Sequence, residues 1–307
     1  MHDLAVIGGG PAGLAATVYA LRKGLDVVLV GGELGGKTAL TFSLPEAQPA
    51  PAIRAHEQVA EFRRQVGYLG HAVRSARAVA LEEDAAGFSV ALSDGTSLSA
   101  GRLVVATGVR PRPLGVRGEG QFFGKALGSN SLSYSQLLRD RRVVIVGDSD
   151  RALESALECA RQAEIVYLIL EPHAEYARGH LQRAEQRANL EIYNGYHVVS
   201  FQGDEFARSV ELCRGDRGCT DHPHTRIEAD AFFVEREPEP NSSLVAALVH
   251  RTPRGAIRID AANATSNPRI FAAGDVTDVG VEQVLVALGE GARAGLAAYR
   301  SLVLREV

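Results

Sequence analysis

The feature that most constrains this chain is the glycine-rich turn IGGGPAG near its start, which places Gly8, Gly10 and Gly13 in the spacing GxGxxG. The apolar run LAVI precedes the turn, and apolar residues at helical spacing follow it over residues 12–23. A strand, a glycine turn and a helix in this order are typical of a βαβ unit that binds a dinucleotide. Because the run DVVLV supplies a second strand, the start of the chain predicts such a unit.

The chemistry of such a turn gives each glycine a role. Gly8 permits the tight turn, Gly10 lets a pyrophosphate approach the backbone, and Gly13 lets the helix pack closely on the strand. The helix N-terminus offers N–H groups and partial positive charge to phosphates. Pro11 and Ala12 belong to the same turn. We therefore predict a dinucleotide site here, the alternative being a glycine-rich turn without a ligand.

The acidic residue that usually ends the second strand and binds a ribose is missing from this chain. Gly31 and Gly32 follow VVLV instead, and Glu33 is the nearest acid. Glu33 is therefore the candidate ribose contact. Gly35 and Gly36 come next, and their lack of a side chain allows the backbone to lie against a flat ring.

A second βαβ pattern occupies the middle of the chain: VVIVG, at residues 143–147, precedes a helical pattern over 151–162 and the apolar run EIVYLIL. Segments rich in proline and glycine or polar residues flank it at 109–120 and 236–243, and we predict both as linkers. The tail contains IFAAGDV and then a helix from about Glu282. Its last ~65 residues are too few for a sufficient core of their own.

The predicted fold class is therefore α/β, with two Rossmann-like three-layer ββα domains, the second inserted into the first. The first, dinucleotide-binding domain would comprise residues 1–113 and 242–307. The inserted domain would comprise residues 118–238.

Composition excludes several classes of function. The net charge of -4 gives no sign of the clustered basic surface that nucleic-acid binding needs. No apolar run approaches the ~20 residues of a membrane span. The strand-like LAVIGGG begins at Leu4, which leaves no room for a signal peptide, and three cysteines do not make a disulfide framework. We expect a cytoplasmic protein with neither a nucleic-acid nor a membrane partner.

Four motifs occur in a fixed order along the chain: GGGPAGLAA, GGELGGK, VVATGVRPR, and IFAAGDVTD followed by EQVLVALGEGARA. Together they resemble the thioredoxin reductases and their relatives, two-domain flavoproteins of low molecular weight in the pyridine nucleotide-disulfide oxidoreductase class. The likeness covers nearly the whole chain. It implies an FAD-binding first domain, an NAD(P)-binding-like inserted domain, oxidoreductase activity and a homodimer.

The resemblance also implies the FAD contacts, which are the glycine turn and four later groups: Gly8, Gly10, Gly13, Gly35, Gly36, Lys37, Thr107, Gly108, Gly274, Asp275, Gln283 and Val284. Lys37 replaces the glutamine of the family's GGQ turn beside the isoalloxazine. Asp275 would bind the ribityl chain or its phosphate region, the alternative being a helix cap or turn residue. A helix that starts at Gln283 would stabilise negative charge on reduced flavin and make reduction easier.

The family's redox-active CxxC pair is absent. Its four positions fall on Asn130, Ser131, Leu132 and Ser133, and the neighbouring proton donor falls on Tyr134. Because serine cannot cycle between thiol and disulfide, the dithiol relay from flavin to thioredoxin is lost. Tyr134 is the one candidate catalytic residue, as a proton donor to reduced flavin. The alternative is that this stretch only fills the vacated space.

The second nucleotide turn, GDSDRA, departs from the family pattern. Gly147 and Ala152 keep the outer positions, but Ser149 replaces the middle glycine, and Asp148 adds negative charge near the expected pyrophosphate. One interpretation is that Asp148, Ser149 and Asp150 cap the N–H groups of their own helix, the groups that a dinucleotide would use.

The segment that holds the 2′-phosphate of NADPH in the family, HRR, falls here on Leu170, Glu171 and Pro172. A carboxylate at Glu171 would repel that phosphate by up to ~4 kcal/mol before screening, at ~4 Å and an effective dielectric constant of ~20. NADPH is therefore disfavoured. NADH stays open, because Glu171 could bind its ribose hydroxyl, the role that an acid at this position has in NAD enzymes.

Cysteine and histidine gather in one predicted hairpin loop, where Cys213, Cys219, His222 and His224 have the spacing C-x₅-C-x₂-H-x-H. Thiolate and imidazole suit zinc, but the spacing matches no standard zinc finger, so we predict no metal. A loop disulfide or redox pair and a plain exposed loop are the other interpretations. The third cysteine, Cys159, falls on a helical pattern and is expected to be buried.

The sequence thus predicts an FAD-dependent oxidoreductase with the thioredoxin reductase fold, without the dithiol relay and with a degraded NADPH site. Electrons would pass between the flavin and a donor or acceptor such as a ferredoxin-like redox protein or a small molecule. Two alternatives remain: an NAD(P)H-dependent reductase like other family members, and a non-catalytic FAD-binding module that senses redox state.

Overall fold

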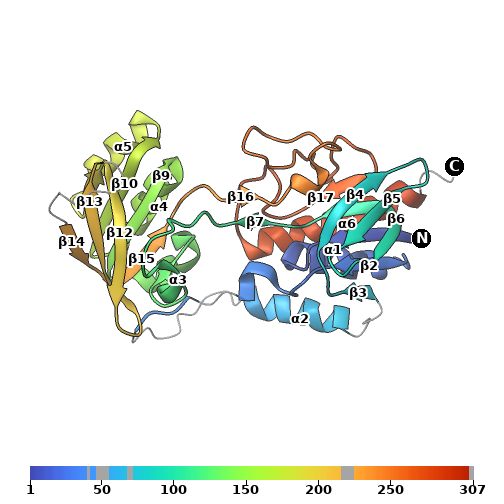
Figure 1. The fold of residues 1–307 in the computed structure, drawn as a ribbon, viewed down its shortest axis with the longest axis horizontal. Helices are drawn as coiled ribbons and strands as arrows, with labels where there is room; N and C mark the ends of the chain where they lie inside the picture. Colours follow the sequence, from blue (N-terminus) through green and yellow to red (C-terminus); the bar gives the residue numbers. More distant parts are fainter. Residues whose placement is uncertain (40–41, 46–54, 68–71, 216–224, 304–307) are drawn as a thin grey trace. The chain divides into compact units, whose positions relative to one another are not determined.

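The computed structural model describes residues 1–39, 42–45, 55–67, 72–215 and 225–303. The chain forms two compact units (Figure 1). Unit 1 comprises Met1–Ala39, Ile53–Arg110 and Glu239–Val307, and unit 2 comprises Leu40–Ala52 and Pro111–Pro238. The described residues 42–45, which the sequence analysis placed in the first domain, therefore group with unit 2.

Unit 1 is built on one sheet with the strand order β3-β2-β1-β6-β5-β4, and β17 pairs with β6. The parallel strands are β1 (His2–Ile7), β2 (Val27–Val30), β3 (Val73–Arg74), β6 (Ser97–Val105) and β17 (Ile270–Ala272). The antiparallel strands are β4 (Ala78–Glu83) and β5 (Phe88–Leu92). Because β17 lies in register beside β6, the tail of the chain completes the sheet that the first residues began.

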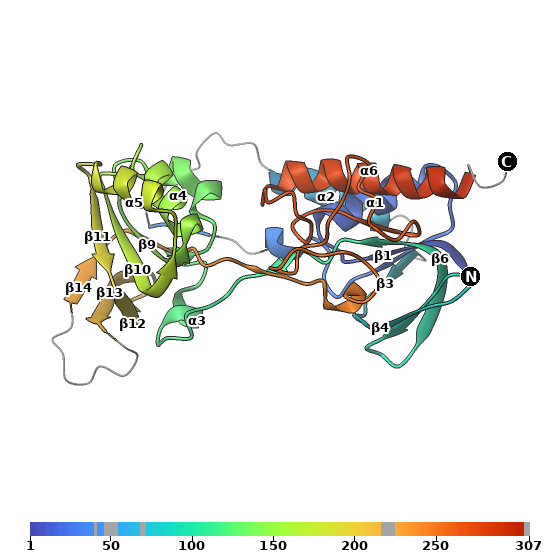
Figure 2. The same cartoon turned by 90° about the horizontal axis from the view of Figure 1, so that it is seen from above.

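Three helices cover one face of this sheet, α1 (Pro11–Leu21), α2 (Ala55–Gly67) and α6 (Val284–Val303), as Figure 2 shows. Successive strand residues face opposite sides, so Val6 packs with the helices while Ala5 and Ile7 pack on the other face. Short 3₁₀ helices lie at Gly36–Ala39 (η1) and Ser243–Val245 (η4).

Glycines on α6 bring it close to α1. A Cβ atom on Gly291 would lie 2.0 Å from the carbonyl oxygen of Ala12, and one on Gly295 would lie 2.6 Å from that of Ala16. Only small residues permit this approach of the two backbones. The packing places the start of α6 close to the first glycine turn, although the two lie far apart in the sequence.

Unit 2 has a parallel sheet with the order β11-β10-β9-β15-β8 and an antiparallel sheet with the order β12-β13-β14. The parallel strands are β8 (Leu127–Gly128), β9 (Arg142–Ser149), β10 (Ile165–Glu175), β11 (Leu190–Asn194) and β15 (Ala231–Val234). The others are β12 (Tyr196–Gly203), β13 (Ala207–Arg214) and β14 (Thr225–Glu228), and the helices are α3 (Glu119–Phe122), α4 (Asp150–Cys159) and α5 (Arg178–Glu185). The predicted α/β class with two Rossmann-like units is confirmed.

The two predicted linkers contain more structure than expected. Their ends pair as a short antiparallel ladder of β7 (Val109–Arg110) and β16 (Glu239–Pro240), and α3 begins within the first of them. The 3₁₀ helix η3 (Ser131–Leu138) occupies the stretch where the CxxC pair would lie. In the part of the chain that the structure describes, no helix combines the length and apolarity needed to cross a membrane.

The segment that follows Lys37 contributes to the core of unit 2. Ser43 forms a parallel bridge with Lys125, and its backbone accepts a hydrogen bond of 2.9 Å from the N–H of Ala126. Leu44 is buried in the unit 2 core. A stretch close in sequence to the first glycine turn thus packs within the inserted unit.

Candidate functional site

The first glycine turn has the geometry that the spacing predicts. A Cβ atom on Gly13 would lie 1.8 Å from the carbonyl oxygen of Gly8, and one on Gly8 would lie 2.2 Å from that of Ala106. A Cβ atom on Gly10 would meet nothing within 4 Å. Gly8 and Gly13 therefore permit close backbone packing, whereas Gly10 leaves open space over the helix start.

The N-terminus of α1 is not capped by a side chain. Its N-cap residue is Gly10, Pro11 follows within the first turn, and no acidic residue lies in that turn. The first N–H groups of a helix carry partial positive charge and need a partner. Open space and uncapped N–H groups together fit an anionic group such as a pyrophosphate.

The second glycine pair lies directly on the first turn. The N–H of Gly35 donates to the carbonyl oxygen of Gly9 over 2.8 Å, and a Cβ atom on Gly36 would lie 3.1 Å from the Cα of Gly10. Gly31 is also constrained, because its Cβ would lie 2.8 Å from the backbone nitrogen of Gly9. The side chain of Glu33 is exposed, and its predicted ribose contact stays a prediction.

Thr107 and Gly108 follow β6 and hold a returning segment of unit 1. The hydroxyl of Thr107 donates to the carbonyl oxygen of Asn241 over 2.7 Å, and the side-chain amide of Asn241 donates back to the carbonyl oxygen of Thr107 over 3.0 Å. The N–H of Asn241 donates to the carbonyl oxygen of Gly108. These hydrogen bonds in both directions fix the end of β6, where the resemblance predicts contacts with the cofactor.

The AGD turn rests on a buried carboxylate that the sequence analysis missed. The N–H of Gly274 donates to Oε2 of Glu290 over 2.7 Å, and the hydroxyl of Thr277 lies 3.3 Å from the same oxygen. Glu290 is 4% exposed, and burial raises the pKa of its carboxyl group despite these hydrogen bonds. The sequence contained one indication of this buried acid, because Glu290 lies among the small and apolar residues of LGEGARAG.

A lysine joins three of the predicted FAD-binding segments. Nζ of Lys37 lies 2.7 Å from Oδ2 of Asp275 and 2.7 Å from Oε2 of Glu282. The lysine side chain is 36% exposed, and the two carboxylates are 14% and 15% exposed. Burial is the largest single influence and lowers the pKa of Lys37, but the two carboxylates outweigh it and raise that pKa above its ordinary value. Lys37 is therefore a protonated ammonium at neutral pH.

The structure thus brings Lys37, Asp275 and the start of α6 together, and it adds Glu282, which the sequence analysis did not single out. Gln283 precedes the helix, which begins at Val284. Asp275 lies in a turn well before α6 begins, and its carboxylate pairs with Lys37.

Unit 2 repeats the strand, turn and helix, but side chains fill the surroundings of its turn. Gly147 is required, since a Cβ atom there would lie 2.5 Å from the carbonyl oxygen of Glu235 and 2.6 Å from the Cβ of Ala152. Ser149 is the N-cap of α4, and the hydroxyl lies 3.5 Å from Oε1 of Glu237.

The predicted capping of α4 by Ser149 does not occur. The hydroxyl of Ser149 forms no cap hydrogen bond with the helix. Asp150 instead accepts from the N–H of Ala177 over 2.9 Å and lies 2.7 Å from Nδ1 of His180, while Asp148 pairs with Arg112. Asp148 and Asp150 thus have partners outside α4.

Two buried carboxylates of unit 2 pair with arginines. Both oxygens of Glu171 are bound by the guanidinium of Arg236, which also donates to the carbonyl oxygen of Pro113 over 2.8 Å. Glu235, which is fully buried, accepts from Nε of Arg151 over 2.9 Å and from the N–H of Ser131 over 2.5 Å. Arg236 thus holds both oxygens of Glu171, and the predicted contact of Glu171 with an NADH ribose stays a prediction.

Tyr134 lies in an aromatic cluster of unit 2. Its ring centroid is 4.7 Å from that of Phe42 and 6.4 Å from that of Phe233. Burial raises the pKa of the Tyr134 hydroxyl. These contacts support the interpretation that this stretch fills space, and a catalytic role for Tyr134 stays a prediction.

The cysteines have different environments. Cys159 is buried as expected and free, and burial raises the pKa of its thiol to about 11. Cys213 is buried and disulfide-bonded. Cys219, His222 and His224 lie outside the described residues, and within the described ranges no three potential metal ligands cluster.

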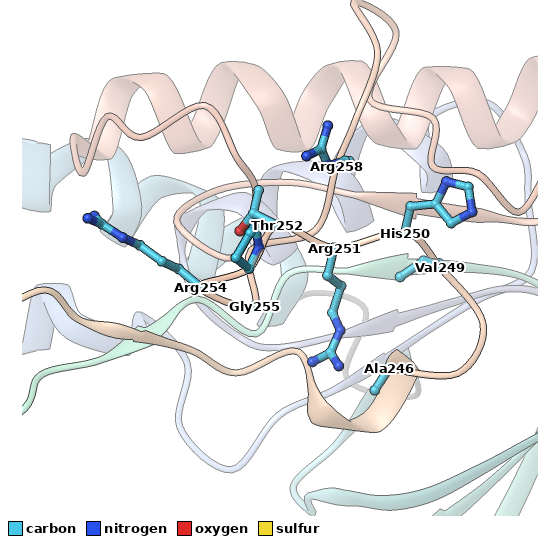
Figure 3. Close-up of a pocket in the computed structure, with 9 residues that line it drawn as sticks. Ala246, Val249, His250, Arg251, Thr252, Arg254, Gly255 and Arg258 are labelled. Carbon is cyan, nitrogen blue, oxygen red and sulfur yellow. The ribbon is translucent and has the colours of Figure 1, made fainter.

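A separate hollow of about 700 Å³ lies in unit 1, within a loop that the sequence analysis did not single out. Arg251, Arg254 and Arg258 line it, but their side chains point in different directions (Figure 3). Nη1 of Arg251 is turned toward the hydroxyl of Ser242, 3.2 Å away. The hollow therefore presents no convergent set of cations for one anion.

Comparison with solved structures shows the fold. Thioredoxin reductase from Streptococcus pyogenes MGAS5005 superposes with a TM-score of 0.87 at 24% sequence identity, covering 99% of each chain. Thioredoxin reductase from Giardia duodenalis gives a TM-score of 0.87 at 24% identity, covering 98% of this chain and 99% of that one.

Curated relatives are longer than this chain. A Pseudomonas putida protein, an alkyl hydroperoxide reductase subunit, is 32% identical over 98% of this chain and 58% of its own length. NADH dehydrogenase of Bacillus subtilis (strain 168) is 28% identical over 98% of this chain and 58% of its own length. The chain thus spans somewhat more than half the length of these relatives.

The family model described as pyridine nucleotide-disulphide oxidoreductase matches residues 2–291. The resemblance to thioredoxin reductase-like flavoproteins that the motifs predicted is confirmed. The chain belongs to the pyridine nucleotide-disulphide oxidoreductase family, whose members are flavin-dependent oxidoreductases.

Proposed function

We propose that this protein is an FAD-dependent oxidoreductase that passes electrons between its flavin and a redox partner without a CxxC relay and without NADPH. The observation that carries the proposal is the contrast between two similar turns. The turn of unit 1 is open at Gly10 and has no acid in its first helical turn, whereas the turn of unit 2 has Asp150 there and is surrounded by its own ion pairs.

The residues of unit 1 fit FAD. Open space at Gly10 and the uncapped N-terminus of α1 would receive the pyrophosphate, and Asp275 would bind the ribityl chain or its phosphate region. When bound, FAD supplies hydride and single-electron chemistry. The N-terminus of α6 and the ammonium of Lys37 contribute positive potential in the same region.

The residues of unit 2 do not fit NADPH. A phosphate would compete with carboxylates that already hold Arg112, Arg151 and Arg236. Removing one partner from a buried ion pair leaves an uncompensated charge and costs about 3–5 kcal/mol. Asp150 in the first turn of α4 and Glu237 beside Ser149 add further carboxylates, so the phosphate would meet repulsion as well as competition.

The redox partner must be able to exchange electrons directly with the flavin. A ferredoxin-like protein or a small molecule would exchange electrons directly with the flavin, since no dithiol carries them onward. We further propose a cytoplasmic homodimer, a proposal that rests on the resemblance to thioredoxin reductases.

One observation favours a second candidate, an NADH-dependent reductase: a relative with matching sequence is named NADH dehydrogenase. The Arg236–Glu171 pair weighs against it, because a ribose would share an acid that already binds a guanidinium.

Anaerobic stopped-flow mixing of the FAD-loaded protein with NADPH, NADH and reduced ferredoxin separates the candidates. We expect reduced ferredoxin to bleach the flavin absorbance and NADPH to leave it oxidised. Rapid bleaching by NADPH would overturn the proposal, and rapid bleaching by NADH alone would establish the second candidate. Flavin that stays oxidised with every donor except dithionite would instead favour the redox-sensing module.

A further inference from the structure

The charged cluster around Lys37 joins three segments of unit 1. Lys37 comes from η1, Asp275 from the AGD turn, and Glu282 from the residues just before α6. Glu282 lies 245 positions from Lys37 in the sequence, yet their charged atoms are 2.7 Å apart. The fold therefore assembles this cluster, which no local pattern in the sequence predicts.

The cluster brings charges of opposite sign into contact. One ammonium faces two carboxylates, and each carboxylate is mostly buried. Buried ionic groups are a weak means of stabilising a fold, because their desolvation offsets their attraction. The two carboxylates hold the lysine protonated, so its charge persists through the neutral pH range.

The cluster lies where its charges would act on a bound flavin. All three segments are those that the family resemblance places against the flavin, and the N-terminus of α6 adds partial positive charge. A flavin gains negative charge when it is reduced. A nearby cation therefore favours the reduced form and a nearby anion favours the oxidised form, which is how proteins tune a flavin.

We propose that Lys37 and Glu282 are an opposed pair of charges that sets the reduction potential of the bound flavin. The proposal rests on FAD binding in unit 1, as proposed above. Lys37 raises the potential, and Glu282 both positions the lysine and limits its effect. Because glutamine stands at the lysine position in the family that the chain resembles, Lys37 would make this flavin easier to reduce than its relatives' flavin would be in the same surroundings.

The test is a charge series measured on the FAD-loaded protein: Lys37→Gln, Glu282→Gln and the double variant. Midpoint potentials are measured at constant pH by equilibration with reference dyes. We expect Lys37→Gln to lower the potential and Glu282→Gln to raise it. Each change should alter the ratio of affinities for reduced and oxidised FAD by about tenfold, which is about 30 mV for a two-electron couple. The double variant, which changes both charges, should lie between the two single variants.

Matched controls use the same substitutions at exposed positions of unit 1, Lys23→Gln and Glu61→Gln, which should leave the potential unchanged. Shifts of the same sign in both single variants, or no shift in either, would overturn the proposal. Glu282→Gln retains the Lys37–Asp275 pair, so it gives a result even where Lys37→Gln fails to fold. A wild-type protein that does not bind FAD would instead overturn the proposed function, which separates the two failures.

Discussion

The two units carry the same strand, turn and helix but treat the helix N-terminus differently. In unit 1 the first turn of α1 has glycine at the N-cap and no acid. In unit 2 the first turn of α4 contains Asp150, follows Ser149, and is flanked by arginines that already hold carboxylates. A phosphate site therefore requires more than the fold, because the groups that would bind the anion must also be without competing partners.

The largest expected effect tests the open turn of unit 1. Gly10→Val should raise the dissociation constant of FAD on the order of a hundredfold, or about 2.7 kcal/mol, because the new side chain occupies the space that the pyrophosphate needs. The fold should persist, since a Cβ at Gly10 meets nothing within 4 Å. Flavin fluorescence titration of the apoprotein measures the change. Gly120→Val, at a similarly open position in unit 2, is the matched control, and equal affinities in both variants would contradict the assignment.

A second effect tests the closed turn of unit 2. Arg236→Gln should lower the free energy of unfolding of unit 2 by about 3–5 kcal/mol, because it leaves the buried carboxylate of Glu171 without its partner. Urea denaturation measures the loss, and adding Glu171→Gln should restore part of it. The control is Arg161→Gln in the exposed Arg161–Glu158 pair, which should change stability by less than about 1 kcal/mol. A similar loss in both arginine variants would show that burial of the pair is not what matters.

A smaller effect is expected from the pH dependence of unit 1. Folded Glu290 holds its proton to higher pH than it does in the unfolded chain, because burial raises its pKa. Stability should therefore fall as pH rises from the ordinary carboxyl pKa through the raised value. Glu290→Gln should flatten that part of the stability profile, measured by denaturation at a series of pH values. An unchanged slope would mean that another group controls it.

The smallest expected change sharpens the comparison between the turns. Ser149→Gly restores the missing middle glycine, but NADPH affinity, measured by calorimetry, should change by less than about tenfold because the paired arginines remain. Tight NADPH binding by this variant would show that the serine side chain, rather than the ion pairs, closes the site.

The features that the sequence predicted well are local. The glycine turn, the paired βαβ patterns and the AGD turn each depend on residues within a few positions of one another, where spacing directly reflects backbone geometry. The family resemblance then assigned segments that are far apart in the sequence to one predicted FAD site.

The features that the sequence did not predict are partnerships over long separations. Lys37 with Glu282, and Glu171 with Arg236, depend on how whole elements pack. The expected cap from Ser149 does not form, and Asp150 binds a group from the segment before α5. Propensity describes what a side chain can do, whereas the fold decides which partner lies within reach.

The packing of Phe42 and Leu44 within unit 2 has a practical consequence. A fragment that runs from Pro111 to Pro238 would omit both side chains, because they lie much earlier in the sequence, before the rest of unit 1 intervenes. Such a fragment would expose part of its hydrophobic interior to water and would be expected to aggregate. To express the inserted unit by itself, the segment that contains Phe42 and Leu44 would have to be included, for example by fusing it before Pro111 through a flexible linker.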